Sequence, residues 1–318
     1  LDDGQLALLE GSGGVQVFDA DCNPVEHPDT FDIDWDASAA TLGGYPDFMA
    51  KEISEQPEAI ERLLKDRLGE HGINLDELSM SNEELATIDR IYLVACGTSY
   101  HVGLIARELV EQWAKIPVFC EYASELNYKE PLVTAHTLCV IITQSGETAD
   151  TLTAARRMRA MGCKVFAITN VLGSTAARES DGTLYVQAGP EICVCSTKAY
   201  TAQIVASALL ALRLSLAKGQ MDQAEVEQLP DLIREVLKRD WQDQRAASLF
   251  RNARSALFLG RGVNSTTAYE GALKLKEVSY LHAEAYPAGE MKHGPIALLE
   301  PGFPVVAIVP ADHVHDKT

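Results

Sequence analysis

The stretch "IITQSGETADT", residues 141–151, joins an apolar run directly to a turn crowded with small hydroxyl side chains. The hydroxyl residues that surround Gly146 are Thr143, Ser145, Thr148 and Thr151. A second turn of this kind follows the apolar run of "YLVACGTSYH", residues 92–101, and consists of Cys96, Gly97, Thr98 and Ser99. A helical pattern follows each turn, so both stretches predict a buried strand, a tight turn and a helix.

The same alternation continues along the chain from residue 91. The predicted strands cover residues 91–95, 138–143, 165–169 and 184–188. The predicted helices cover residues 99–113, 149–161 and 197–217. Short buried strands that alternate with helices indicate an α/β fold with a doubly wound parallel sheet.

A second copy of this domain is predicted after a helical, charged bridging stretch at residues 221–253. The stretch "SALFLGRGVNSTTAYEGALKLKEVSYL", residues 255–281, again gives a strand, a glycine and a long helix. Gly97 and Gly260 are 163 residues apart, which is a domain-sized period. One further strand is predicted at residues 303–310, so we expect the second domain to be truncated, with about 60–80 residues missing beyond Thr318.

The chain before residue 90 differs in pattern. Residues 1–21 alternate apolar and polar residues around a Gly-Ser-Gly-Gly turn and predict a hairpin. Residues 45–68 have helical spacing, with Pro57 near the start of a second helix. The expected segments are a remnant hairpin, a linker with helices, a first domain, and a bridging helix with an incomplete second domain, at residues 1–28, 29–89, 90–220 and 221–318.

Composition excludes several classes of function. The net charge of −19 is concentrated in residues 1–90, which hold 22 Asp and Glu against 5 Lys and Arg. No basic stripe is present to bind nucleic acid, and no apolar run approaches the ~18 residues of a membrane span. The seven cysteines are odd in number and scattered, which favours reduced thiols in the cytoplasm and no metal site. No organic cofactor is implied either.

The hydroxyl-rich turns fit the binding of a phosphate. Ligands of an open parallel sheet lie beyond the carboxyl ends of its strands. A helix that begins there offers unpaired backbone N–H groups, to which Ser and Thr add neutral donors. The alternative is that these hydroxyls cap their own helices. Two such turns in one sheet favour the ligand, and "CVCSTKAYTAQ", residues 193–203, supplies a third small-residue turn.

The stretch "EGALKLKE", residues 270–277, carries a possible catalytic group. Glu270, Lys274 and Glu277 share one helix face by their spacing. The alternative is an exposed Glu–Lys pair, but the neighbours Ala272, Leu273, Leu275 and Val278 favour a helix wrapped by protein. A polar loop is expected at residues 282–295, and its imidazoles and carboxylates fit the acid–base chemistry of a sugar isomerisation.

Together with "GGYPDFMAKEISEQPEAI" and "AEAYPAGEMKHGP", these motifs resemble the glucosamine-6-phosphate synthases, the glutamine–fructose-6-phosphate aminotransferases. The resemblance runs from Leu1 to about Val309. It implies a glutaminase domain, of which residues 1–21 would be the last hairpin, and two sugar-isomerase (SIS) domains. The expected reaction converts fructose 6-phosphate and ammonia from glutamine to glucosamine 6-phosphate, the first step of amino-sugar (hexosamine) synthesis.

The resemblance also assigns residues. The sugar-phosphate site would contain Cys96, Gly97, Thr98, Ser99, Thr143, Gln144, Ser145, Thr148, Val194 and Ser196. Glu277 would move a proton between C1 and C2, supported by Lys274 and Glu270. His293 would open the sugar ring, usually from the neighbouring subunit, so a homodimer is expected. The family's glutaminase nucleophile and its tail lysine have no counterpart between Leu1 and Thr318, so we expect this chain alone to be inactive.

Two other functions stay open on the sequence. A non-catalytic sugar-phosphate-binding regulator of the same fold would use the hydroxyl turns without a base and a ring-opening group. A simple phosphosugar isomerase would have neither the glutaminase-like hairpin nor the linker. The Glu277 and His293 pattern therefore separates a synthase from a regulator.

Overall fold

The structure is a computed structural model that describes residues 1, 4–28, 30, 41–65, 67–69, 72–219, 235 and 244–318. Its contacts divide the chain into two compact units, residues 1–35 and residues 36–318. The first unit contains the predicted hairpin, in which β1 (Leu6–Leu9) pairs antiparallel with β2 (Val15–Phe18). The predicted boundaries of the four segments remain predictions.

The second unit is built on a parallel sheet of five strands. In chain order they are β5 (Arg90–Ala95), β6 (Val118–Tyr122), β7 (Thr137–Ile142), β8 (Lys164–Thr169) and β9 (Gly182–Tyr185). Their order in the sheet is β6-β5-β7-β8-β9, and every neighbouring pair is parallel. The connection reverses direction between β5 and β7, so a crevice opens beyond their carboxyl ends.

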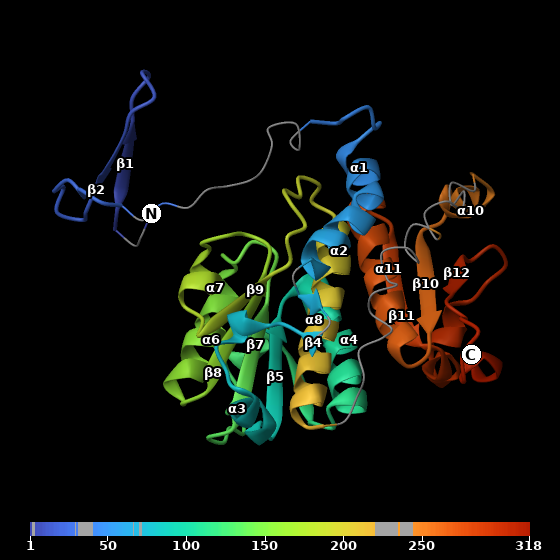
Figure 1. Cartoon of the computed structure of the whole chain (residues 1–318). Helices are drawn as coiled ribbons and strands as arrows, with labels where there is room; N and C mark the ends of the chain where they lie inside the picture. The colour runs from blue at the N-terminus through green and yellow to red at the C-terminus, as the bar shows by residue number, and fades with distance from the viewer. Residues whose placement is uncertain are drawn as a thin grey trace. The chain divides into compact units, whose positions relative to one another are not determined.

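Helices cover both faces of this sheet, as Figure 1 shows. On one face, apolar side chains from β5, β7 and β8 pack with α2, α3, α4 and α8. On the other, the alternate residues of the same strands pack with α5, α6 and α7. The covering helices are α2 (Gln56–Leu64), α3 (Asn82–Thr87), α4 (Gly97–Trp113), α5 (Ala123–Leu126), α6 (Ala149–Ala160), α7 (Thr175–Arg178) and α8 (Lys198–Ala217). This arrangement confirms the predicted doubly wound α/β fold.

Among the residues that the structure describes, one helix, α8, is long and apolar enough to span a membrane by length and composition. This differs from the expectation that no apolar stretch approaches that length. In this protein 72% of its most apolar window is buried, and α8 packs against α4 and α2. Ala202, Leu209 and Leu214 are fully buried in the core. Its hydropathy is therefore that of a helix surrounded by protein on most sides.

A second, smaller sheet follows α10 (Gln244–Phe250) and has the order β11-β10-β12, all parallel. Its strands are β10 (Ser255–Gly260), β11 (His282–Pro287) and β12 (Val305–Ala307). The long helix α11 (Val263–Ser279) packs against β10 and against α4 of the larger sheet. The two predicted strands and the helix between them are confirmed, and most of the predicted bridging helix lies outside the described residues.

Two predictions about local structure were wrong. Residues 282–287 were expected in a loop, but they form β11, because Ala283 and Ala285 alternate with polar residues and Ala283 is buried. Strand β6 was missed, because "VFCEY" has a half-exposed edge position and little apolar periodicity. Small or polar residues give a weak strand signal in the sequence. These two segments form strands because β11 pairs with β10 and β6 pairs with β5.

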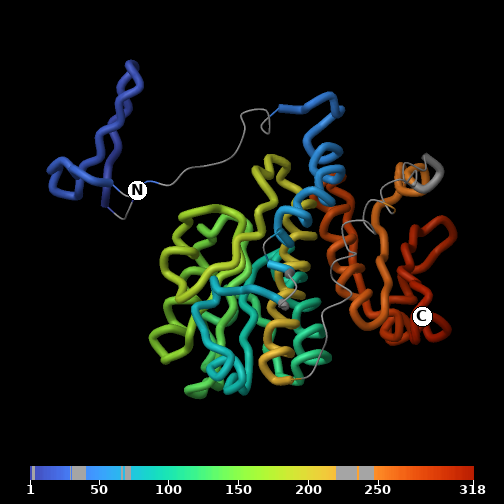
Figure 2. The backbone as a smooth tube through the Cα atoms, viewed as in Figure 1, coloured from blue at the N-terminus to red at the C-terminus, as the bar shows by residue number. Residues whose placement is uncertain are grey.

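The N-terminal helices of this unit are α1 (Phe48–Ser54) and α2. Asp47 caps α1, since its carboxylate accepts from the Ala50 N–H at 2.8 Å. Pro57 lies in the first turn of α2, as predicted. Figure 2 shows this segment, in blue, running beside α8. Small pieces complete the fold: β3 (Leu68–Gly69), β4 (Gly72–Ile73), η2 (Asp76–Leu78), η4 (Ala288–His293), η5 (Pro295–Leu298) and η6 (His315–Lys317).

Candidate functional site

A pocket of about 250 Å³ opens where the strand order reverses between β5 and β7. Its lining comes from the turn before α4, the turn before α6 and the turn before α8. The lining residues are Cys96, Thr98, Ser99, Ile142, Thr143, Gln144, Ser145, Thr148, Thr151 and Ser196. Eight of the ten residues predicted to bind the sugar phosphate are among them. The three turns, which are far apart in the sequence, therefore form one site.

The hydroxyls of the turn before α6 do not cap that helix. Thr148 is the N-cap residue of α6, yet within the described chain its side chain makes no cap hydrogen bond. Thr143 Oγ1 accepts from the Gly146 N–H at 3.2 Å and lies 3.4 Å from Thr148 Oγ1. Ser145 Oγ accepts from the Glu147 N–H at 3.1 Å. The hydroxyls order the turn itself, so the first N–H groups of α6 are left for a ligand.

Two glycines give these turns their shape. Gly146 has φ of +72°, and a Cβ at this position would lie 2.1 Å from Ser174 Oγ. The Gly146 carbonyl also accepts from the Ala176 N–H at 3.0 Å, which brings the turn against the start of α7. Gly97 begins α4 with φ of +54°. Both positions need the left-handed backbone that glycine adopts without strain.

The polar face of α11, on which the spacing places Glu270, Lys274 and Glu277, contains two ion pairs. Lys274 Nζ lies 3.2 Å from Glu270 Oε1 and 2.7 Å from Glu277 Oε2. Only 7% of the Glu270 side chain is exposed, against 18% for Lys274 and 30% for Glu277. The alternative of an exposed Glu–Lys pair therefore does not hold for Glu270 and Lys274. The helix is less fully wrapped than expected toward its end, where Val278 is 49% exposed.

Burial and charge act in opposite directions on these groups. Burial alone would raise the pKa of Glu270, but the hydrogen bond with His101 and the charge of Lys274 outweigh it and lower that pKa. Burial alone would lower the pKa of Lys274, but its hydrogen bond with Glu277 and the charge of Glu270 raise it. The site therefore holds the buried carboxylate of Glu270 and the partly buried ammonium of Lys274 in their charged forms.

Thr98 joins the pocket to the charged face of α11. Its hydroxyl donates to Glu270 Oε1 at 3.0 Å and accepts from Lys274 Nζ at 3.0 Å. His101 Nδ1 lies 2.6 Å from Glu270 Oε2 on the other side of the carboxylate. His101 was not predicted from the sequence. Its spacing of three residues from Thr98, which puts both on one face of α4, is the signal that would have found it.

Residues 186–197, between β9 and α8, complete the site. Ser196 lines the pocket, and Cys195 beside it is buried. Burial raises the pKa of Cys195 to about 12, Lys274 opposes this effect, and a hydrogen bond with Glu277 adds to it. This loop therefore contacts both the pocket and the charged face of α11. Val194, by contrast, is 94% exposed and does not line the pocket within the described residues.

Two other predicted residues lie outside the pocket. Gly97 lines a neighbouring cavity of about 310 Å³ together with His101, Tyr122, Tyr269 and Lys276. His293 is exposed at the end of η4, and in the described part of the chain no hydrogen bond or ion pair joins it to Glu277 or Lys274. The structure of one chain thus brings together Glu270, Lys274 and Glu277 but not His293. Its ring-opening role stays a prediction that needs a partner subunit.

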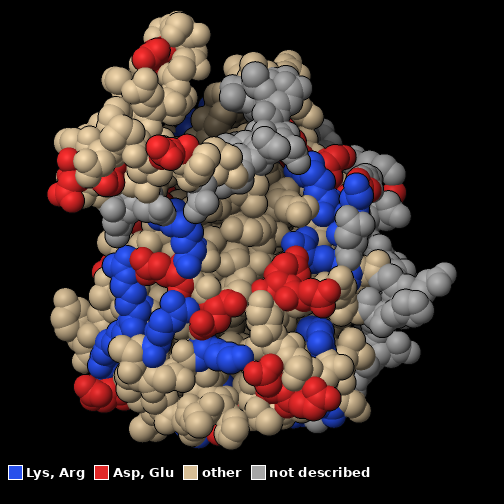
Figure 3. Space-filling model, turned by 60° about the vertical axis from the view of Figure 1, so that its left-hand side comes forward, with Lys and Arg blue, Asp and Glu red and all other residues tan. Residues whose placement is uncertain are grey.

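The charges around the pocket bear on its ligand. No lysine or arginine is among the described residues that line it, so its positive potential comes from helix N-termini and hydroxyl donors. No group of three or more His, Cys, Asp or Glu side chains in the described residues is arranged to hold a metal ion. On the face of the molecule in Figure 3, basic side chains gather toward the lower left, with acidic side chains beside them, among the residues described there.

Comparisons with known proteins agree with this geometry. Residues 84–213 and 249–318 match the model of the SIS domain, and the chain belongs to this family. Over 325 residues it is 43% identical to the glutamine–fructose-6-phosphate aminotransferase (isomerizing) of Clostridium perfringens, covering 100% of this chain and 53% of that protein. The chain thus spans about half the length of the curated relatives it matches. This confirms the predicted resemblance.

Solved structures show the same relationship. The C-terminal domain of glucosamine-fructose-6-phosphate aminotransferase from Francisella tularensis has a TM-score of 0.80 and 40% identity, covering 87% of this chain and 80% of that one. Tagatose-6-phosphate ketose/aldose isomerase from Escherichia coli has a TM-score of 0.69 at 20% identity, a likeness that shows the fold alone. The predicted SIS fold is therefore confirmed.

Proposed function

We propose that this chain is the synthase part of a glutamine–fructose-6-phosphate aminotransferase, which forms glucosamine 6-phosphate from fructose 6-phosphate and ammonia. One observation carries the proposal: Thr98, in the hydroxyl-lined pocket, is hydrogen-bonded to both Glu270 and Lys274 of the charged face. A pocket suited to a phosphate and a carboxylate–ammonium group suited to proton transfer are therefore in contact. The 43% identity to the Clostridium perfringens protein supports the choice of reaction.

The reaction assigns a task to each part of the site. The phosphate is held by the N–H groups at the start of α6 and by the hydroxyls of Ser145 and Thr148. Ammonia replaces the C2 carbonyl oxygen of the open-chain ketose, which leaves as water. A base then moves one proton from C1 to C2, and the proton of the C1 hydroxyl passes to the imine nitrogen, so that C1 becomes the aldehyde and C2 carries the amino group. Glu277 is the proposed base, with Lys274 fixed 2.7 Å from its carboxylate.

The ammonia is proposed to come from a glutaminase domain of the same protein, to which the N-terminal hairpin would belong. His293 is proposed to open the sugar ring from a second subunit, because no described contact brings it to the site within one chain. This predicts a homodimer. Light scattering over a wide concentration range checks the prediction, and a monomer throughout would contradict the role of His293 in trans.

The free cysteines agree with a protein that works in a reducing compartment. All seven are free, and Cys139 and Cys163 are buried in the core. Disulfides are rare in the cytoplasm, so free thiols agree with the proposed cytoplasmic location. No organic cofactor is needed for the proposed steps, since each requires an acid, a base or a hydrogen-bond donor.

The test uses the substitution Glu277→Gln, which removes the base but keeps the size of the side chain. Calorimetry should show that wild type and variant bind fructose 6-phosphate alike and bind unphosphorylated fructose much more weakly. Proton exchange with deuterated solvent at C1 of the bound sugar should occur in the full-length wild-type protein and not in its full-length Glu277→Gln variant. Binding without such exchange in either protein would favour the alternative, a sugar-phosphate-binding regulator. Absence of binding would contradict both.

A further inference from the structure

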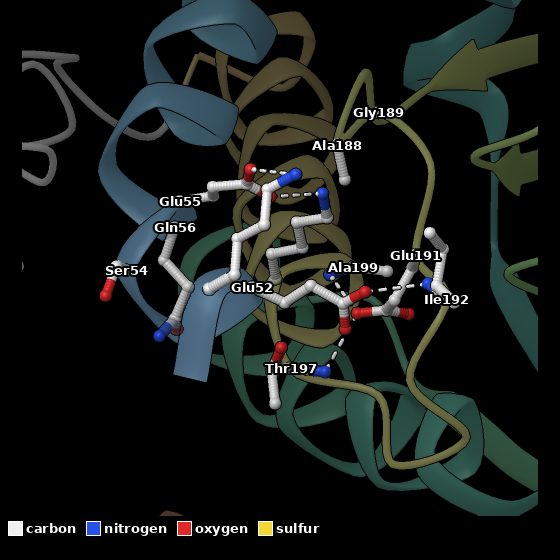
Figure 4. A network of polar contacts seen from close by, with 12 residues as sticks. Glu52, Ser54, Glu55, Gln56, Ala188, Gly189, Glu191, Ile192, Thr197 and Ala199 are labelled. Atoms are coloured by element: carbon white, nitrogen blue, oxygen red, sulfur yellow. Dashed lines mark hydrogen bonds and ion pairs between the residues drawn. The ribbon is translucent and has the colours of Figure 1, made fainter. Parts of the chain in front are cut away.

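Glu52, on helix α1, holds the loop that completes the pocket. Glu52 is only 2% exposed. Its carboxylate oxygen Oε1 accepts hydrogen bonds from the N–H groups of Ile192 at 2.7 Å and Cys193 at 3.1 Å. Among the described residues Glu52 Oε2 has no hydrogen-bond partner. A buried carboxylate with a free oxygen is costly for stability alone, so such a group indicates a functional role. Figure 4 shows Glu52 reaching from α1 to this loop.

Glu191, next to the segment that Glu52 holds, then fixes the start of α8. Its Oε1 accepts from the N–H groups of Thr197 at 2.9 Å and Ala199 at 3.1 Å. The N-cap residue Thr197 makes no cap bond with its own side chain in the described structure, so Glu191 caps α8 in its place. The other oxygen of Glu191 accepts from Ser196 Oγ at 2.9 Å. The orientation of the pocket residue Ser196 therefore depends on Glu191.

Two further contacts join the same segments. Glu55 Oε2 lies 2.6 Å from Nζ of Lys198, a residue that is 4% exposed at the start of α8. Gln56 Oε1 accepts from the hydroxyl of Thr201, one turn further along α8. Glu52, Glu55 and Gln56 thus form a polar clamp on the junction between the loop and α8. All three come from the short stretch "EISEQP", residues 52–57, which does not itself line the pocket.

We propose that Glu52 is a positioning residue for sugar-phosphate binding, which acts through the loop of residues 186–197 to hold Ser196 in the pocket. This inference rests on the proposed function, since it takes fructose 6-phosphate as the ligand. It extends that function, because it makes the segment before the first SIS sheet part of the binding machinery. Ser196, which lines the pocket, and the buried Cys195, which interacts with Glu277, both belong to this loop. Glu52 therefore positions loop residues beside the pocket and beside the proposed base.

The first experiment measures the clamp without any ligand. Amide hydrogen exchange of the full chain should become faster at residues 192–199 in Glu52→Ala, since the N–H groups of Ile192 and Cys193 lose their acceptor. Glu52→Gln, which keeps one acceptor oxygen, should restore much of the protection. Ser54→Ala is the matched control on the same helix, because the Ser54 hydroxyl donates to Ala50 O of α1 itself. Unchanged exchange at residues 192–199 in Glu52→Ala would overturn the proposal.

The second experiment is a double-mutant cycle on the affinity for fructose 6-phosphate. Glu52→Ala and Ser196→Ala should each weaken binding about tenfold, and the double variant should bind about as weakly as either single variant. A general loss of structure would instead give effects that multiply, and this outcome would contradict a role through Ser196. If the wild type binds no sugar phosphate, the proposed function fails, while the exchange experiment still decides whether Glu52 holds the loop.

Discussion

His101 Nδ1 lies 2.6 Å from Glu270 Oε2, so a partly buried polar contact joins helix α4, which covers the large sheet, to helix α11, which covers the small sheet. The other oxygen of Glu270, Oε1, accepts a hydrogen bond from the Thr98 hydroxyl and forms an ion pair with Lys274 Nζ. The contact places the charged face of α11 against the pocket. It therefore links the packing of the two sheets to the chemistry proposed for the site.

Replacing His101 by Ala should destabilise the protein by about 1.5–3 kcal/mol, since a buried carboxylate loses a strong hydrogen bond. Urea unfolding at pH 7 measures the change in the free energy of unfolding. His136→Ala is the matched control, because His136 is an exposed histidine in the same unit. Equal effects of the two substitutions would show that the His101–Glu270 contact contributes little.

Stability should depend on the ionisation of Glu270 at acid pH. Its pKa is lowered in the folded protein from an ordinary value of 4.5, so its charged form stabilises the fold above that value. This contribution is lost as the pH falls through the lowered pKa. In Glu270→Gln, the fall in unfolding free energy between pH 6 and about pH 3 should be smaller than in the wild type. Urea unfolding at several pH values in this range measures the free energy of unfolding of both proteins. The same loss of stability toward acid pH in the wild type and in Glu270→Gln would contradict the prediction.

The hydroxyls of the turn before α6 should matter for binding more than for folding. Ser145→Ala and Thr148→Ala each remove a donor to a charged phosphate, so affinity for fructose 6-phosphate should fall roughly 10- to 150-fold. Thr148 makes no cap bond in the described helix, so its loss should change stability by less than about 1 kcal/mol. Calorimetry and thermal melting separate the two effects. A lower melting temperature with unchanged affinity would instead support helix capping.

Gly146→Ala should destabilise the protein by at least about 3 kcal/mol, since it adds a left-handed strain and a clash with Ser174. Gly162 offers a matched control: it has φ of +90°, and in the described structure a Cβ there meets nothing within 4 Å. Gly162→Ala should therefore cost only the backbone strain, about 1–2 kcal/mol. Denaturant unfolding of both variants measures the difference. Equal losses would show that Ser174 moves away without cost.

Much of the site was predictable because its residues occupy fixed places relative to local elements. A strand followed by a turn of small residues and a helix places those residues at the carboxyl edge of a parallel sheet, wherever the strand lies. Cys96, Thr143 and Ser145 can therefore be assigned to that edge from their positions in the sequence. Likewise the spacing of Glu270, Lys274 and Glu277 places them on one face of α11, where the structure joins them by two ion pairs.

The fold class, the turns and the family resemblance can be predicted from the amino-acid sequence, because apolar periodicity and local turn chemistry act between neighbouring residues. Three features follow from the folded arrangement instead: which turns share a pocket, the contacts of His101 and Thr98 with Glu270, and the contact of Glu52 with a loop about 140 residues further along. Such contacts depend on strand order and helix packing. Their hydrogen bonds join residues far apart in sequence, for which no local periodicity gives a signal.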